Sequence, residues 1–154
     1  MEGNKKIIIY TDGGARDNPG PAAIGVVIAD PLMGASIELS RTSLGQVKQY
    51  SEAIGNTTNN VAEYRAVIFA LRKAKALLGN EKAKETELEI RSDSELIVSQ
   101  LKGEYKIKDE ELKPLFVDVW NLKQDFKLVT FKLIPREENK EADRLVNKAL
   151  DTLL

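Results

Sequence analysis

The sequence predicts an α/β fold in which a mixed five-stranded sheet, with three antiparallel strands plus two parallel strands, is flanked by helices. The order of the predicted elements carries this prediction: three strand-like segments come first, and two further strands are separated by helices. Strands joined by short turns pair antiparallel, whereas strands separated by helices add in parallel. The chain has 154 residues, of which 42% are hydrophobic and 31% charged. This length and composition predict a single globular domain over residues 1–154.

The first half of the chain contains the three strand-like segments and one long helical segment. Residues 6–12 form a β-rich run that ends at two glycines, and a turn at residues 18–20 precedes a second run at residues 23–29. A third strand is expected within residues 36–50. Residues 61–78 place apolar side chains at helical spacing on one face, which predicts a helix.

The second half alternates between helices and strands. Short alternating runs predict strands at residues 87–91 and 127–134. Apolar side chains at helical spacing predict helices at residues 94–101, 110–126 and 138–153. Each of these strands is therefore expected to join the sheet in parallel.

Histidine and cysteine are both absent from the chain. Disulfides, thiolate metal sites, cysteine nucleophiles, serine–histidine triads and histidine ligands are therefore excluded. Any chemistry must use carboxylates, hydroxyls, lysine, arginine and backbone groups. The formal net charge is −1, whereas broad nonspecific binding of nucleic acid needs a clearly basic surface. Any nucleic-acid contact must then be local and assisted by metal ions.

Targeting and membrane signals are not predicted. The N-terminal residues lead into an apolar run that is too short for a signal peptide. The most apolar long segment, residues 61–78, carries five charged side chains and does not resemble a membrane span. We therefore expect a monomeric, cytoplasmic protein without a membrane partner.

Acidic residues lie at the ends of four predicted elements. Two follow strands, and two lie in the first turn of a helix. In chain order these residues are Asp12, Glu63, Asp93 and Asp143.

Each acid taken alone has a purely structural explanation. An aspartate at a strand end suits a turn before glycines, and one in a first helical turn is favoured by the helix dipole. Glu63 matches a capping pair with Asn60, three residues earlier. Asp93 or Ser94 matches the N-cap of the following helix. A single acid therefore does not identify a site.

The combination of acids is more informative. If the strand that ends at Asp93 lies parallel beside the first strand, Asp93 and Asp12 meet at neighbouring strand ends, where open sheets place ligands. Carboxylates about 4 Å apart repel by roughly 4 kcal/mol per pair at an effective dielectric near 20. Two Mg²⁺ or Mn²⁺ ions accept hard oxygen ligands and compensate this charge. Paired ions of this kind serve displacement at phosphorus.

The chain resembles the type 1 ribonucleases H over roughly residues 6–150. A lone TDGG sequence would be weak support, but several blocks match in order and at compatible spacing. These blocks are residues 10–20 (YTDGGARDNPG), 56–63 (NTTNNVAE), 90–94 (IRSDS) and 136–143 (REENKEAD).

The resemblance implies an endonuclease that hydrolyses the RNA strand of RNA–DNA hybrids and leaves 3′-hydroxyl and 5′-phosphate ends. Asp12, Glu63, Asp93 and Asp143 are the implied ligands of two Mg²⁺ or Mn²⁺ ions. Each acid is therefore expected to be catalytic as well as metal-binding.

The resemblance also implies which groups contact the substrate. Gly13, Gly14 and Ala15 would present their backbone to the RNA strand, where a missing side chain is useful. Asn59 and Asn60 would hydrogen-bond the hybrid in its minor groove. The 2′-hydroxyl is the group that separates RNA from DNA.

Thr58 is implied as a contact to a DNA-strand phosphate, because hydroxyl and backbone groups at a helix start suit an anion. Thr58 and the two asparagines that follow it are also ordinary helix-cap residues. Both explanations stay open at the level of sequence.

Two departures from many members of the family are visible. The histidine that many members carry before the fourth acid is missing, and Arg136 is the cation on this loop. Arginine stays protonated and cannot act as a base, so Arg136 would bind the scissile phosphate or the leaving oxygen, unless it is a solvated surface residue. Residues 101–112 also lack a long basic helix and loop, which predicts modest hybrid affinity. No extra N-terminal hybrid-binding module is expected.

Other functions remain open on the sequence. The same fold serves other nucleases and strand-transfer enzymes, because a fold alone does not fix function. Cleavage of double-stranded or structured RNA is a second enzymatic possibility, with double-stranded RNA as a possible partner. A non-catalytic nucleic-acid-binding module is the third, and it would be favoured if one of the four acids were replaced.

Overall fold

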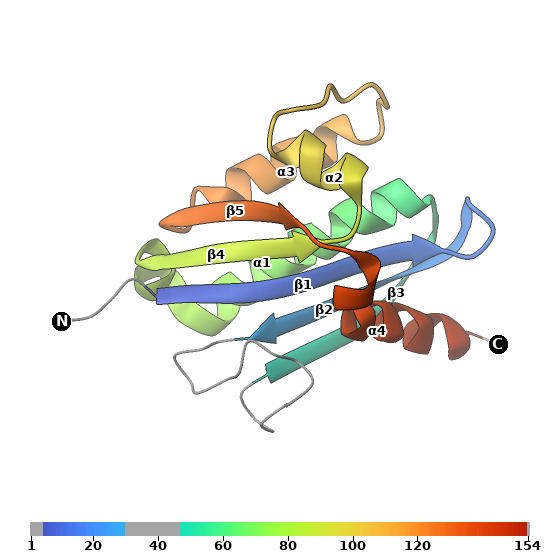
Figure 1. Ribbon diagram of the computed structural model, residues 1–154, viewed down its shortest axis with the longest axis horizontal. Helices are drawn as coiled ribbons and strands as arrows, with labels where there is room; N and C mark the ends of the chain where they lie inside the picture. Colours follow the sequence, from blue (N-terminus) through green and yellow to red (C-terminus); the bar gives the residue numbers. More distant parts are fainter. Residues whose placement is uncertain (1–4, 30–46, 154) are drawn as a thin grey trace.

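The computed structural model describes residues 5–29 and 47–153 of the chain (Figure 1). In chain order its elements are β1 (Lys5–Ala15), β2 (Gly20–Ala29), β3 (Val47–Thr57), α1 (Asn59–Lys84), β4 (Thr86–Ser92), α2 (Glu95–Leu101), α3 (Lys113–Lys123), β5 (Leu128–Leu133), the short 3₁₀ helix η3 (Arg136–Glu138) and α4 (Lys140–Asp151).

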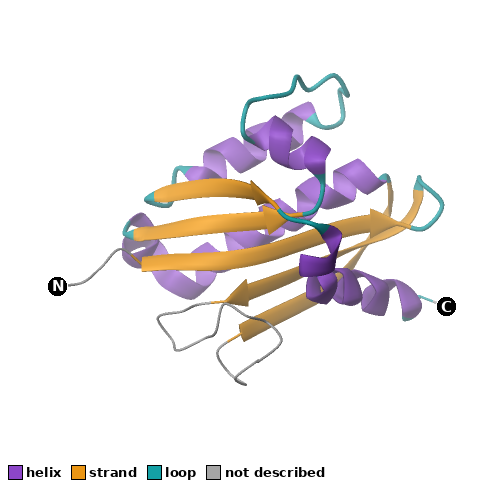
Figure 2. Cartoon of the chain, in the orientation of Figure 1, coloured by secondary structure: helices purple, strands orange, loops and turns teal. Residues whose placement is uncertain are grey.

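The strands form one five-stranded sheet in the order β3-β2-β1-β4-β5. β1 pairs antiparallel with β2, and β2 pairs antiparallel with β3. β4 lies parallel to β1, and β5 lies parallel to β4. The predicted mixed sheet is therefore confirmed, with β1 at its centre (Figure 2).

Helices cover both faces of this sheet. α1 and α3 pack on one face, while α4 lies on the other face over β1, β2 and β3 (Figure 1). The largest cluster of buried apolar side chains lies between the sheet and α1, and includes Ile9, Ile24, Tyr64, Leu71 and Ile90. Smaller clusters lie under α4. The sheet is thus held between two packed layers.

The prediction for the third strand was wrong in its extent. Residues 36–46 lie outside the described residues, and β3 continues to Thr57, well past the predicted limit of residue 50. β3 is the edge strand of the sheet, and its side chains are partly or fully exposed along its length. Because no residue of β3 is fully buried, the strand tolerates polar side chains and lacks the apolar alternation that identifies a strand in sequence.

Helix boundaries differ from the predictions at identifiable residues. α1 has a break at Gly79, where φ is +82°, so the regular helix ends where the sequence predicted. α3 starts at Lys113 rather than at residue 110, because Pro114 occupies its first turn and favours a helix start there.

Candidate active site

Asp12 and Asp93 lie just beyond the point where the parallel pairing of β1 and β4 stops. β1 and β4 run in register up to the pair Tyr10 and Arg91, and each acid comes two residues later in its chain. Carboxylate oxygens of Asp12, Glu63 and Asp93 all lie within 4.8 Å of one another. The sequence prediction that these strand ends bring acids together is confirmed in this geometry.

Glu63 reaches this cluster because α1 approaches β1 very closely. A Cβ atom at Gly13 would lie 2.3 Å from both the carbonyl carbon and the oxygen of Ala62. Only glycine fits at that distance. The Gly13 N–H donates to the Glu63 Oε1 at 3.2 Å, which directs the carboxylate toward β1.

Two of the structural explanations for single acids are wrong. β1 continues to Ala15, so Asp12 lies within a strand and does not open a turn. Glu63 does not form a capping pair with Asn60, because Thr58 is the N-cap of α1 and its hydroxyl accepts from the Val61 N–H at 3.2 Å.

The fourth acid, Asp143, is carried by α4 on the opposite face of the sheet. Gly25 of β2 lies directly beside Asp12 in the strand register. A Cβ atom on Gly25 would lie 2.2 Å from the carbonyl oxygen of Ala142, so the first turn of α4 rests on this glycine. The carboxyl of Asp143 lies close enough to Asp12 to raise the pKa of Asp12. Asp143 itself is exposed, which places it at the rim of the cluster.

Three of the acids, Asp12, Glu63 and Asp93, have raised pKa values. Burial, and then the charges of Glu63, Asp93 and Asp143, raise the pKa of Asp12 to about 9. Burial and the charge of Asp93 raise the pKa of Glu63 to about 7, although hydrogen bonds from Gly13, Ser94 and Asp12 oppose this rise. All of these carboxyls ionise together at neutral pH only if positive charge is added. The cluster therefore has the donor chemistry and the charge that fit a divalent cation.

Arg136 acts on the same cluster. It opens the 3₁₀ helix η3 between β5 and α4, where its side chain is exposed. Burial raises the pKa of Asp93, and the charge of Arg136 is the largest influence that opposes this rise. The guanidinium is thus close enough to the carboxylates to matter electrostatically.

The predicted substrate-contacting residues surround the end of β1. The Asn59 Oδ1 accepts from the Ala15 N–H at 2.7 Å, and the Asn59 N–H donates to the Asn18 Oδ1 at 3.0 Å. Asn60 is partly exposed in the first turn of α1. At Gly14 a Cβ atom would meet no atom closer than 3.8 Å. These contacts hold the β1–β2 turn against the start of α1.

Two further polar residues belong to the site and were not predicted there. The Ser94 hydroxyl hydrogen-bonds the Glu63 carboxyl, in addition to capping α2 at the Ile97 N–H. Asn139 is completely buried, and its Nδ2 donates to the Thr11 carbonyl oxygen at 2.9 Å. The sequence offers one signal for Asn139: it lies four residues before Asp143, at the start of the last helix.

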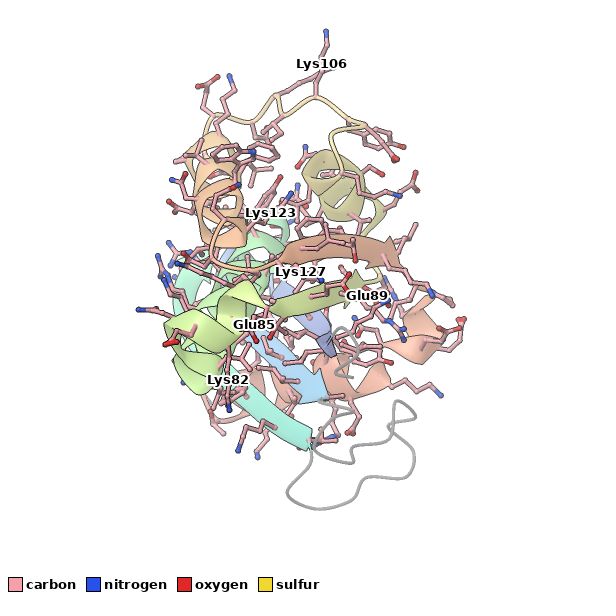
Figure 3. The ribbon with its side chains drawn as sticks, turned by 90° about the vertical axis from the view of Figure 1, so that its left-hand side faces the viewer. Lys82, Glu85, Glu89, Lys106, Lys123 and Lys127 are labelled. Carbon is pink, nitrogen blue, oxygen red and sulfur yellow. The ribbon has the colours of Figure 1, made fainter. Side chains whose placement is uncertain are left out.

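The segment between α2 and α3, residues 102–112, contains neither helix nor strand. Lys106 lies on this segment and points away from the rest of the molecule (Figure 3). The long basic helix and loop whose absence was predicted therefore does not occur between α2 and α3. Within the described ranges, no helix has the length and apolar character needed to cross a membrane.

The strand order is that of the ribonuclease H fold, and the carboxylate cluster lies where nucleases of this fold bind metal ions. The family model described as "Reverse transcriptase-like" matches residues 10–149. The LC11-RNase H1 structure in complex with an RNA/DNA hybrid is 47% identical, with a TM-score of 0.81, over 96% of this chain and 98% of that chain. RNase H1 from the archaeon Halobacterium salinarum NRC-1 is 34% identical, with a TM-score of 0.77, over 96% and 98% of the two chains.

Among curated relatives, the bifunctional protein Rv2228c of Mycobacterium tuberculosis is 40% identical over 148 residues. That match covers 95% of this chain but 36% of the relative, so the chain spans about a third of that protein. The chain belongs to the reverse transcriptase-like family, within its ribonuclease H1 branch.

Proposed function

We propose that this chain is a metal-dependent endoribonuclease that hydrolyses the RNA strand of RNA–DNA hybrids. The observation that carries the proposal is the cluster of Asp12, Glu63 and Asp93, whose oxygens lie within 4.8 Å of one another. The similarity to LC11-RNase H1, which binds an RNA/DNA hybrid, supports the substrate class.

Asp12, Glu63, Asp93 and Asp143 would hold two Mg²⁺ or Mn²⁺ ions. Bound ions of this kind supply an activated water and stabilise charge on a leaving oxygen. The chain's own residues set the geometry: the Gly13 N–H and the Ser94 hydroxyl orient the Glu63 carboxylate. In the reaction, water forms a new bond to phosphorus while the bond to the 3′-oxygen breaks.

Arg136 would bind the scissile phosphate or the departing 3′-oxygen from the open side of the cluster. Its guanidinium carries a fixed charge and several N–H donors in a plane, which match a phosphate. Because arginine stays protonated, Arg136 contributes charge and hydrogen bonds rather than proton abstraction.

The substrate would be contacted by polar groups that have no hydrogen-bond partner within the described part of the protein. The N–H groups of Gly13 and Ala15 donate to Glu63 and Asn59. Side-chain amide nitrogens of Asn59 and Asn60 would then contact the hybrid. The carboxylate of Glu63 would read the 2′-hydroxyl of the RNA strand.

Cleavage of labelled RNA–DNA hybrid, double-stranded RNA and double-stranded DNA, each with Mg²⁺ and with EDTA, tests this proposal. We expect the hybrid to be cut with Mg²⁺ only, and the DNA duplex to survive. Asp12→Asn should abolish cleavage, whereas Asp109→Asn, the same change outside the cluster, should not. Faster cutting of double-stranded RNA would assign a different substrate. Binding of the hybrid without cleavage by the unaltered chain would indicate a non-catalytic module.

A further inference from the structure

Asn139 is an asparagine at an N-cap position that does not cap its helix. It precedes α4, and no side-chain cap hydrogen bond forms there. Its side chain is instead directed into the protein, where Asn139 is 0% exposed. An asparagine at a helix start ordinarily stabilises the helix through its side-chain oxygen. Some other interaction must therefore explain this residue.

The Nδ2 atom of Asn139 lies beside two parts of the carboxylate cluster, the backbone before Asp12 and the side chain of Asp93. One of its hydrogens is donated to the Thr11 carbonyl oxygen at 2.9 Å, directly before Asp12 in β1. The carboxylate of Asp93 also lies near this amide, which opposes the rise in pKa that burial causes. Because Oδ1 has no partner among the described residues, the second Nδ2 hydrogen is the group available to Asp93. The amide thus lies between β1 and the acid that follows β4.

The backbone of the same residue holds the fourth acid. The Asp143 N–H donates to the Asn139 carbonyl oxygen at 3.1 Å, in the first turn of α4. Asn139 therefore contacts Asp93, Asp143 and the residue next to Asp12.

The other end of the amide makes no such contact. The Asn139 Oδ1 is the buried side-chain polar atom for which the described residues provide no hydrogen-bond partner. A buried acceptor without a donor lowers stability, so the residue is not optimised for folding alone. A neutral group that donates two hydrogens from one nitrogen requires a primary amide. Serine supplies one donor, and aspartate at neutral pH supplies none.

We propose that Asn139 is a positioning residue whose two N–H groups fix the separation of Asp12 and Asp93, and thereby set the affinity of the cluster for divalent cations. This inference rests on the proposed function, because it assigns Asn139 to the same metal site. Residues behind metal ligands typically change metal affinity by about 10–100-fold when they are altered.

The test compares Asn139→Ser and Asn139→Asp with Asn121→Ser, a change on the exposed surface of α3. Calorimetry without substrate gives the Mg²⁺ dissociation constant, and thermal melting in EDTA gives the stability of each variant. We expect Asn139→Ser to weaken Mg²⁺ binding at least about tenfold, and its hybrid cleavage to be restored at high Mg²⁺ with unchanged KM. Asn139→Asp adds a carboxylate and removes both donors, so it should not recover in this way.

A lowered melting temperature with an unchanged Mg²⁺ dissociation constant would reduce Asn139 to a structural residue and overturn the proposal. If the variants do not fold, the unaltered protein decides the matter by NMR. The two side-chain N–H signals of Asn139 should exchange slowly with solvent and shift on Mg²⁺ addition, and rapid exchange without a shift would contradict us. Tight Mg²⁺ binding by the unaltered protein without hybrid cleavage would refute the proposed function and leave this inference standing.

Discussion

Gly13→Ala tests whether the close approach of α1 to β1 builds the site. Two adjacent glycines in β1 have very different surroundings. A Cβ at Gly13 would lie 2.3 Å from backbone atoms of Ala62 and 2.6 Å from the Glu63 nitrogen, whereas at Gly14 the nearest atoms lie at 3.8 Å. Gly14→Ala is therefore a matched control for stability, with the same added methyl group in the same strand.

The expected loss of stability depends on which atoms the added methyl group would contact. Overpacking in a core typically costs about 1–3 kcal/mol. Backbone atoms cannot rotate away, so Gly13→Ala should lie at the upper end, near 3 kcal/mol. For a chain of this size that corresponds to a fall in Tm of roughly 6–12 °C. At Gly14, where φ is not in the left-handed region, alanine should leave Tm unchanged or raise it slightly.

The same change should also impair catalysis, because it pushes the start of α1 away from β1 and moves Glu63 relative to Asp12. A displacement of about 1 Å in such a site can lower the rate on the order of 10²-fold. Thermal melting in EDTA and hybrid cleavage in saturating Mg²⁺ measure the two effects. Equal melting temperatures and equal kcat for Gly13→Ala and Gly14→Ala would refute the reasoning.

Two further predictions concern charge. Because the pKa of Asp12 is raised from 3.8 to about 9, the folded chain keeps a proton that the unfolded chain releases, so stability in EDTA should fall as pH rises from about 4 to about 9. Asp12→Asn should flatten this fall in melting experiments and abolish cleavage; parallel slopes would contradict the assignment. Arg136→Ala should lower kcat at least about tenfold with KM nearly unchanged, and Arg136→Lys should recover only part. In steady-state kinetics, full kcat in Arg136→Ala would make Arg136 a surface residue.

Much of the fold was predictable because apolar periodicity reflects burial. β1, β2, β4 and β5 have buried residues at positions that the sequence marks as apolar, and α4 has a buried stripe that includes Leu145, Val146 and Leu150. β3 was placed poorly because none of its residues is fully buried, whereas β5, the other edge strand, has buried residues that alternate with exposed ones. The extent of a strand is visible in sequence where buried and exposed positions alternate.

The convergence of Asp12 and Asp93 was also predictable from topology alone. Parallel neighbours in a sheet end at the same edge, so two acids at the ends of such strands meet. This reasoning needs only the strand order, which the spacing of the predicted elements suggests. Placing Glu63 and Asp143 required the family resemblance, because their helices must approach the sheet from opposite faces.

The distances that complete the site depend on residues whose role is invisible in sequence. Gly13 was predicted as a substrate contact and Gly25 was given no role, yet these glycines are where α1 and α4 contact the sheet backbone. Asn139 was predicted only as part of the last helix, yet its side chain is buried and bonds the backbone of β1. In each case the role of the residue depends on a contact with a residue that is distant in the sequence, and the local sequence does not reveal that contact. The Gly13 and Gly14 pair tests this point experimentally, because the same added methyl group should destabilise the protein at Gly13 and should not do so at Gly14.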